Sequence, residues 1–65
     1  MADLLQRART LISRASAIGG ATQWEASLLN AYLVAVENND RDKADRLFRQ
    51  LEELLEQRAE AKRRG

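Results

Sequence analysis

Cysteine, histidine and proline are all absent from this 65-residue sequence, and each absence removes a class of structure or chemistry. Without cysteine there is no disulfide, no thiol nucleophile and no thiolate ligand for zinc. Without histidine the usual general base near neutral pH is missing. Without proline no helix interior is interrupted. We therefore expect no enzyme, no metal site and no cofactor, and a fold that depends on well-packed helices.

Glycine and long apolar runs are also scarce. There are three glycines, two of them adjacent. The longest apolar run, Ala31 to Val36, has six residues, whereas a membrane-spanning helix needs about 20. Met1 to Gln6 lack the basic-then-apolar order of a signal peptide. These features predict one soluble, untargeted domain over residues 1–65, cytoplasmic if it is expressed in cells.

Neither sign of charge dominates, with 11 basic and 10 acidic residues and a net charge of +1. A protein built mainly to hold nucleic acid carries a basic excess on one surface. Here the basic residues outside the acidic stretch form two groups that are far apart in sequence: Arg7, Arg9 and Arg14, and the run Lys62, Arg63 and Arg64. Nucleic acid is therefore an improbable partner.

The first predicted helix covers residues 4–18. Its apolar stripe has the 4-3-4-3 spacing of one helix face and comprises Leu4, Ala8, Leu11, Ala15 and Ile18, with Leu5 and Ile12 beside it. Asp3 is a suitable N-cap, with Gln6 three residues later as in a capping box. Gly19 suits the left-handed position that ends a helix.

The second predicted helix covers residues 23–38. Thr22 and Glu25 have the spacing of a capping box at its start. Asn38 and Asn39 are a suitable stop, because asparagine tolerates the left-handed conformation best after glycine.

The third predicted helix covers residues 41–63, beginning after Asp40. Its apolar stripe comprises Ala44, Leu47, Phe48, Leu51, Leu54 and Leu55. On the opposite face the i,i+4 spacing predicts the ion pairs Asp42–Arg46, Asp45–Arg49 and Arg49–Glu53. Beyond Leu55 the core-side positions are Arg58 and Lys62, so we expect the last two turns to leave the bundle.

Connections of two to four residues between these helices favour antiparallel neighbours. The predicted fold is all-α, an antiparallel up-down-up three-helix bundle. Tyr32 is expected in its core, with the hydroxyl reaching the edge. Trp24 admits two interpretations: it caps the end of the bundle, or it is a contact residue, because tryptophan is over-represented among interface hot spots.

Charge is distributed unevenly along the chain. From Leu4 to Val36 only four of 33 residues are charged, whereas from Glu37 to Arg64 the count is 16 of 28. The third helix thus has a surface typical of exposed helices, and the first two do not. The outer face of the first helix is rich in serine, threonine and alanine, which surface stability alone does not favour. This asymmetry indicates a face reserved for a partner.

The second helix is apolar around most of its circumference. At 100° per residue, the apolar arcs of the first and third helices each span about 140°, whereas the second leaves a gap of only about 100°, between Leu33 and Val34. A middle helix with two neighbours is expected to have a wider arc. The part of the arc that two neighbours do not cover predicts an exposed apolar strip beside the polar-neutral face of the first helix.

Residues 38–58, NNDRDKADRLFRQLEELLEQR, resemble the last loop and helix of computationally designed three-helix miniprotein binders. The whole chain is similar to them in style, with capped helices, short loops and a third helix rich in Glu, Arg and Lys. This resemblance implies a protein that binds one chosen protein target, usually through two of its three helices. Less specifically, residues 38–51 are similar to the second helix of a tetratricopeptide hairpin, although the first-helix pattern fits poorly.

The leading hypothesis is therefore a small, monomeric protein-binding module that docks a target through its first two helices. Its candidate contact residues are Arg7, Thr10, Ser13, Arg14, Ala17, Trp24, Ser27, Ala31 and Val34. Arg7 and Arg14 are expected to supply charged bonds at the rim. The alternatives are a structural bundle that self-associates as a homodimer through the apolar strip, and, less favoured, a small nucleic-acid-binding protein.

Overall fold

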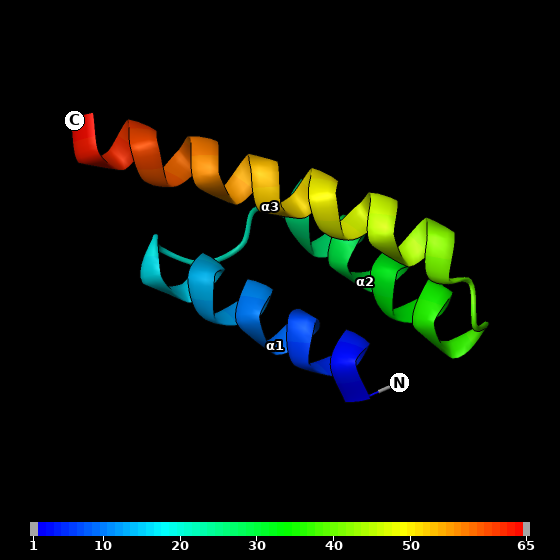
Figure 1. The fold of residues 1–65 in the computed structure, drawn as a ribbon. Helices are drawn as coiled ribbons and strands as arrows, with labels where there is room; N and C mark the ends of the chain where they lie inside the picture. The colour runs from blue at the N-terminus through cyan, green and yellow to red at the C-terminus, as the bar shows by residue number, and fades with distance from the viewer. Residues whose placement is uncertain (1, 65) are drawn as a thin grey trace.

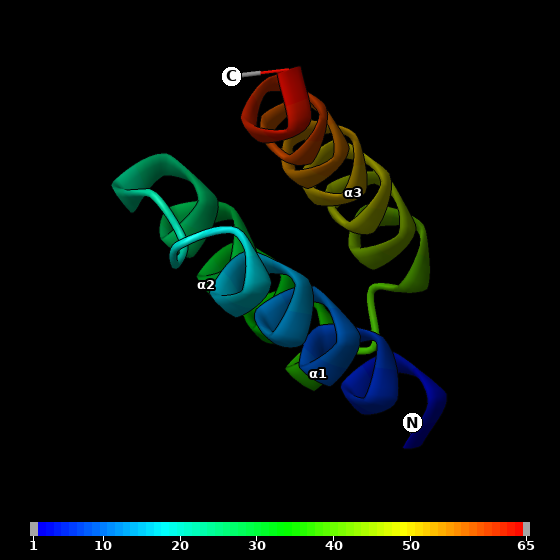
Figure 2. The same ribbon diagram turned by 90° about the vertical axis from the view of Figure 1, so that its left-hand side faces the viewer.

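The computed structural model describes residues 2–64, which form three α-helices packed into a bundle 39 × 17 × 16 Å in extent (Figure 1). Helix α1 covers Ala2–Ala17, α2 covers Gln23–Glu37 and α3 covers Arg41–Arg64. Successive helices run in opposite directions, and α3 extends beyond the connection between α1 and α2 (Figures 1 and 2). The all-α three-helix prediction is confirmed, with helix ends within two residues of those expected.

Both connections begin with a left-handed residue, as the glycine and asparagine positions predict. Gly19 has φ +101° and Gly20 φ +96°, and the Gly20 N–H donates to the Ala15 carbonyl at 2.7 Å. After α2, Asn39 has φ +58°, and the Asp40 N–H donates to the Ala35 carbonyl at 2.8 Å. These bonds satisfy carbonyls that a helix end leaves unpaired, so each chain reversal needs only a few residues.

The predicted capping box at the start of α2 is confirmed. The Thr22 hydroxyl accepts from the Glu25 N–H at 3.1 Å and the Glu25 carboxylate accepts from the Thr22 N–H at 3.0 Å, a complete capping box. Asp40 accepts from the Lys43 N–H at 3.2 Å. The prediction for Asp3 is wrong, because α1 already begins at Ala2 and places Asp3 inside its first turn. An acidic residue there still complements the helix dipole.

The core is built from the predicted apolar stripes together with one face of α2. Its buried members are Leu4, Ala8, Leu11, Ala15, Leu28, Tyr32, Ala35, Val36, Ala44, Leu51 and Leu55. Tyr32 is fully buried, as predicted, but its hydroxyl does not reach the edge. It donates instead to the buried Leu4 carbonyl at 2.6 Å, which fastens α2 to the start of α1.

The buried phenol predicts a loss of stability at high pH. Burial raises the pKa of Tyr32 above its ordinary value of 10.0; Arg7 lowers it and Asp45 raises it to lesser extents. The folded state therefore holds this proton more tightly than the unfolded chain, and its contribution is constant below pH 10 and declines above it. Urea unfolding at several pH values should show this decline in the wild type and not in Tyr32→Phe. At neutral pH Tyr32→Phe should cost about 0.5–1.5 kcal/mol, because it removes one buried hydrogen bond to the Leu4 carbonyl.

The last turns of α3 differ from the expectation. Arg58 does not leave the bundle, because its side chain is half-buried. Its guanidinium donates hydrogen bonds to the Glu25 carboxylate and, at 2.9 Å, to the Gly20 carbonyl. Residues 60–64, by contrast, are exposed.

Deletion of residues 60–65 should therefore change the free energy of unfolding by no more than about 0.5 kcal/mol, because the segment buries little on the rest of the chain. Chemical denaturation of the two lengths tests this. A loss of several kcal/mol would contradict the exposed placement. A deletion that began at Arg58 would be a positive control and should be clearly destabilising.

Candidate functional site

The three pairs of helices pack in different ways, and this difference locates the candidate site. The packing between α2 and α3 is the most extensive of the three. Helices α1 and α3 are joined at their outer edge by ion pairs. Between α1 and α2 lies an open apolar groove. At this last seam exposed large apolar side chains come from both helices, Leu5 and Ile12 from α1 and Leu33 from α2.

The edge between α1 and α3 is charged and paired. Arg7 lies 3.0 Å from Asp45 and its guanidinium stands 5.3 Å from the centre of the Phe48 ring. About two turns further along both helices, Arg14 lies 3.4 Å from Glu52. Exposed pairs of this kind stabilise by about 0–1 kcal/mol each. These pairs therefore contribute more to the orientation of α1 on α3 than to the stability of the contact between the two helices.

These cross-helix pairs replace some of the predicted pairs within α3. Among residues 2–64 no salt bridge joins Asp42 to Arg46, Asp45 to Arg49 or Arg49 to Glu53; the one i,i+4 pair is Arg64–Glu60. The prediction was wrong because it considered α3 alone. In the bundle, α1 brings an arginine within reach of Asp45 from another helix.

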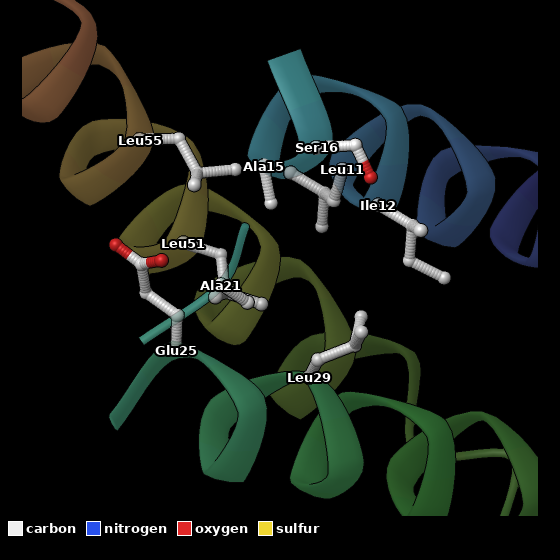
Figure 3. Close-up of a pocket in the computed structure, with 9 residues that line it drawn as sticks. All are labelled: Leu11, Ile12, Ala15, Ser16, Ala21, Glu25, Leu29, Leu51 and Leu55. Carbon is white, nitrogen blue, oxygen red and sulfur yellow. The ribbon is translucent and has the colours of Figure 1, made fainter. Parts of the chain in front are cut away.

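The groove between α1 and α2 opens into a cavity of about 190 Å³ (Figure 3). The side chains of Ile12 and Leu29 face each other across it from the two helices (Figure 3). Its lining residues are Leu11, Ile12, Ala15, Ser16, Ala21, Glu25, Leu29, Leu51 and Leu55. Leu51 and Leu55 come from α3, so the cavity reaches down to the core.

The one charged side chain that lines this cavity, Glu25, already has an ion-pair partner. Glu25 is only 3% exposed, and its carboxylate is directed away from α1 in Figure 3. It accepts from Arg58 of α3 and from the Thr22 N–H. No buried side-chain nitrogen or oxygen in the described part of the chain lacks a hydrogen-bond partner. The cavity is therefore apolar in its chemistry, with the Ser16 hydroxyl as a polar group on its α1 side.

The groove continues along both helices beyond the cavity. Leu5 lies seven residues before Ile12 on α1, and Leu33 lies four residues after Leu29 on α2, so each shares a face with its neighbour. Leu5, Ile12 and Leu33 are 50%, 48% and 36% exposed, respectively. Leu5 and Leu33 directly follow Leu4 and Tyr32, which are joined by a hydrogen bond, so these two leucines lie at the same end of the bundle. We call the surface formed by Leu5, Ile12, Leu29, Leu33 and the cavity the α1–α2 groove.

The sequence-predicted contact residues of α1 lie elsewhere. Arg7 and Arg14 face α3, where they form the two salt bridges. Thr10, Ser13 and Ala17 are exposed on the outer side of the helix, and the Thr10 hydroxyl donates to the Gln6 carbonyl at 3.1 Å. This part of the predicted surface therefore borders α3 and not α2. Whether it contacts a partner stays a prediction.

The predicted contact residues of α2 form one face of that helix, because Trp24, Ser27, Ala31 and Val34 have 3-4-3 spacing. Trp24 is 59% and Val34 45% exposed, while Ala31 is partly buried. Trp24 thus does not close the end of the bundle. Leu29 follows Trp24 by five residues, about 140° around the helix. The face therefore lies on the other side of α2 from the groove, and the structure does not join it to the α1 residues.

Sequence reasoning missed the groove although part of its signal was present. The sequence puts Leu5 and Ile12 beside the α1 stripe, and the width of the α2 apolar arc predicts an uncovered strip beside the polar-neutral face of the first helix. Leu33 is exposed on the α1 side of α2, but the polar-neutral face of α1 borders α3, so the strip does not lie beside the predicted face. The sequence does not reveal how far apart α1 and α2 lie. Their separation is what leaves the cavity open. The role of Glu25 as a buried ion-pair partner was also missed, because its capping-box position explained it fully.

Three further observations concern metal sites, membrane spans and similarity to known proteins. Among residues 2–64 no group of three or more acidic side chains is placed to hold a metal ion. None of the three helices is long and apolar enough to cross a membrane. No protein-family model, curated protein sequence or solved structure matches this chain.

Proposed function

We propose that this chain is a protein-binding module that docks another protein through the α1–α2 groove. The observation that carries this proposal is the groove itself: exposed apolar side chains on two helices, together with a cavity of about 190 Å³ between them. Apolar surface left in water costs about 25 cal/mol for each Å². A contiguous exposed apolar patch of this kind is typical of an interaction site.

Packing and charge on the other helix edges support the same proposal. α3 presents alternating acidic and basic residues to solvent, and the edge between α1 and α3 holds ion pairs. A protein interface is depleted of charge at its centre and charged at its rim. Along α1 and α2 only Arg9 lies beside the groove as an exposed charge near its middle, three residues before Ile12.

The resemblance of residues 38–58 to designed three-helix miniprotein binders agrees with this function. In such a protein α3 supports the other two helices, which face the target. The proposed site keeps those two helices and moves the contact surface from their outer faces to the groove between them. The proposed assembly is one copy of this chain with one target protein.

A matched pair of charge insertions tests the site. Ile12→Glu places a carboxylate in the groove, and Val34→Glu places one on the outer edge of α2, at nearly the same exposure of 48% and 45%. A screen of displayed protein domains would supply a purified partner for titration with each variant. Ile12→Glu should weaken binding at least tenfold, about 1.4 kcal/mol, through a charge buried without a partner. Val34→Glu should bind normally.

The opposite result would place the site on the face that contains Trp24. Circular dichroism and thermal unfolding of both variants must show an intact bundle, since both positions are half-exposed. The proposed function fails if no displayed protein binds in a way that depends on either substitution.

A further inference from the structure

We infer that the partner element of the α1–α2 groove is a single amphipathic helix, which inserts one large apolar side chain into the cavity and presents an acidic residue to Arg9. This inference rests on the proposed function and specifies its partner. Three features of the groove support it: the size of the cavity, the polar side chains that flank its apolar rows and the charge beside it.

The cavity has the size of one large side chain. Its volume is about 190 Å³, and an apolar cavity of about 150 Å³ is large enough to bind benzene. A phenylalanine, leucine or methionine side chain therefore fits it, with Leu11, Leu51 and Leu55 as contacts below. Interface residues that fill such pockets carry most of the binding energy.

Polar side chains flank the apolar rows of the groove. On the α1 side, Leu5 and Ile12 give way to Arg9; on the α2 side, Leu33 gives way to Asn30, and both of these polar side chains are exposed. Two antiparallel helices with an apolar row each form the groove into which a third helix places its i, i+3, i+4 and i+7 residues. The partner helix would complete a four-helix arrangement with α1, α2 and α3.

Arg9, beside the middle of the groove, favours an acidic residue on the partner, although Glu37, four residues after Leu33, is an exposed carboxylate at the end of α2. Arg9 is exposed and has no salt-bridge partner among residues 2–64, whereas Arg7 and Arg14 on the same helix are both paired. Glu25, the acidic residue that lines the cavity, is bound to Arg58 and faces away. An aspartate or glutamate next to the apolar row of the partner helix would therefore form a salt bridge with Arg9.

A second copy of this chain fits the groove less well. A stable dimer buries roughly 800 Å² on each partner, about a sixth of the total accessible surface of 4754 Å². A two-fold contact uses the same surface on both copies, so it would set one groove against the other. Two concave surfaces then face each other, and neither supplies a protruding side chain for the cavity.

The first test selects binders from a displayed library of peptides as long as α2, 15 residues. One half of the library carries apolar residues at helical spacing and the other half carries the same composition at alternating spacing. We expect enrichment of the helical half, with a large apolar residue whose replacement by alanine weakens binding at least tenfold. An acidic flanking residue should also be enriched, and Arg9→Glu should reverse that preference to lysine.

The second test blocks the cavity without removing apolar surface. Ser16 is exposed and lines the cavity, so Ser16→Phe should place a ring in it. If the peptide inserts a side chain there, Ser16→Phe weakens its binding at least tenfold while thermal stability stays equal or rises. Gln50→Phe, which adds the same ring at an exposed position of α3, should leave the affinity unchanged.

Three outcomes would overturn the inference. Peptide affinity that is unchanged or increased in Ser16→Phe would indicate non-specific apolar adhesion. Enrichment of the alternating half would indicate an extended partner. Dimers that sedimentation detects at micromolar concentration, and that Ile12→Glu dissociates, would identify a second copy as the occupant. In the first two cases the proposed function would still hold if a protein partner bound the wild type and Ile12→Glu weakened that binding.

Discussion

Replacement of Leu51 by alanine is expected to lower the free energy of unfolding by about 2–5 kcal/mol. Leu51 is fully buried at the centre of the α3 stripe and belongs to the cluster that joins all three helices. The substitution removes buried methyl groups and leaves a void between helices. The void adjoins the existing cavity, so water can enter it from the groove. In a domain of this size each kcal/mol lowers the melting temperature by about 4–8 °C.

Leu5→Ala is the matched control for this experiment. The chemical change is the same, but Leu5 is half-exposed on the groove. Its cost should stay below about 1 kcal/mol, because much less area leaves water on folding. Denaturant titrations of the two variants compare them directly. Equal costs would mean that Leu51 does not occupy the centre of the core.

Replacement of Arg58 by methionine is expected to destabilise the protein by about 3 kcal/mol, although the arginine itself is about one-third exposed. The reason lies with its partner. The Glu25 side chain is only 4% exposed, and Arg58 is the cation that neutralises it. Without Arg58 a carboxylate remains in an apolar site, and the Gly20 carbonyl loses its guanidinium donor. Leaving one member of such a pair buried alone typically costs about 3–5 kcal/mol.

A second substitution separates the charge from the lost contacts. Arg58→Met combined with Glu25→Gln removes the buried charge while the glutamine can still accept from the Thr22 N–H as a capping-box residue. The double variant should recover more than half of the stability lost in Arg58→Met, measured by urea unfolding. If it is no more stable than the single variant, packing by Arg58 is the dominant contribution and the buried charge is not.

The comparison of these residues shows how far sequence reasoning reaches. The stripe that contains Leu51 has helical spacing, and its burial follows from that spacing alone. Glu25 and Arg58 have no such pattern: they are 33 positions apart, and each had a sufficient local explanation. Arg58 was placed outside the bundle because an arginine at a core-side position normally has nothing to bind. Its partner comes from the start of another helix.

The amino-acid sequence by itself determined the three helices, the capping box of α2, the positions of both connections and most of the core. These features depend on interactions within a few residues, such as the Thr22 capping box and the left-handed Gly19 and Asn39. Only the tertiary structure decided how the helix faces meet. It paired Arg7 and Arg14 with α3, turned Trp24 away from α1, and left the α1–α2 groove open. The rotation and separation of packed helices follow from the fit of side chains across all three of them at once.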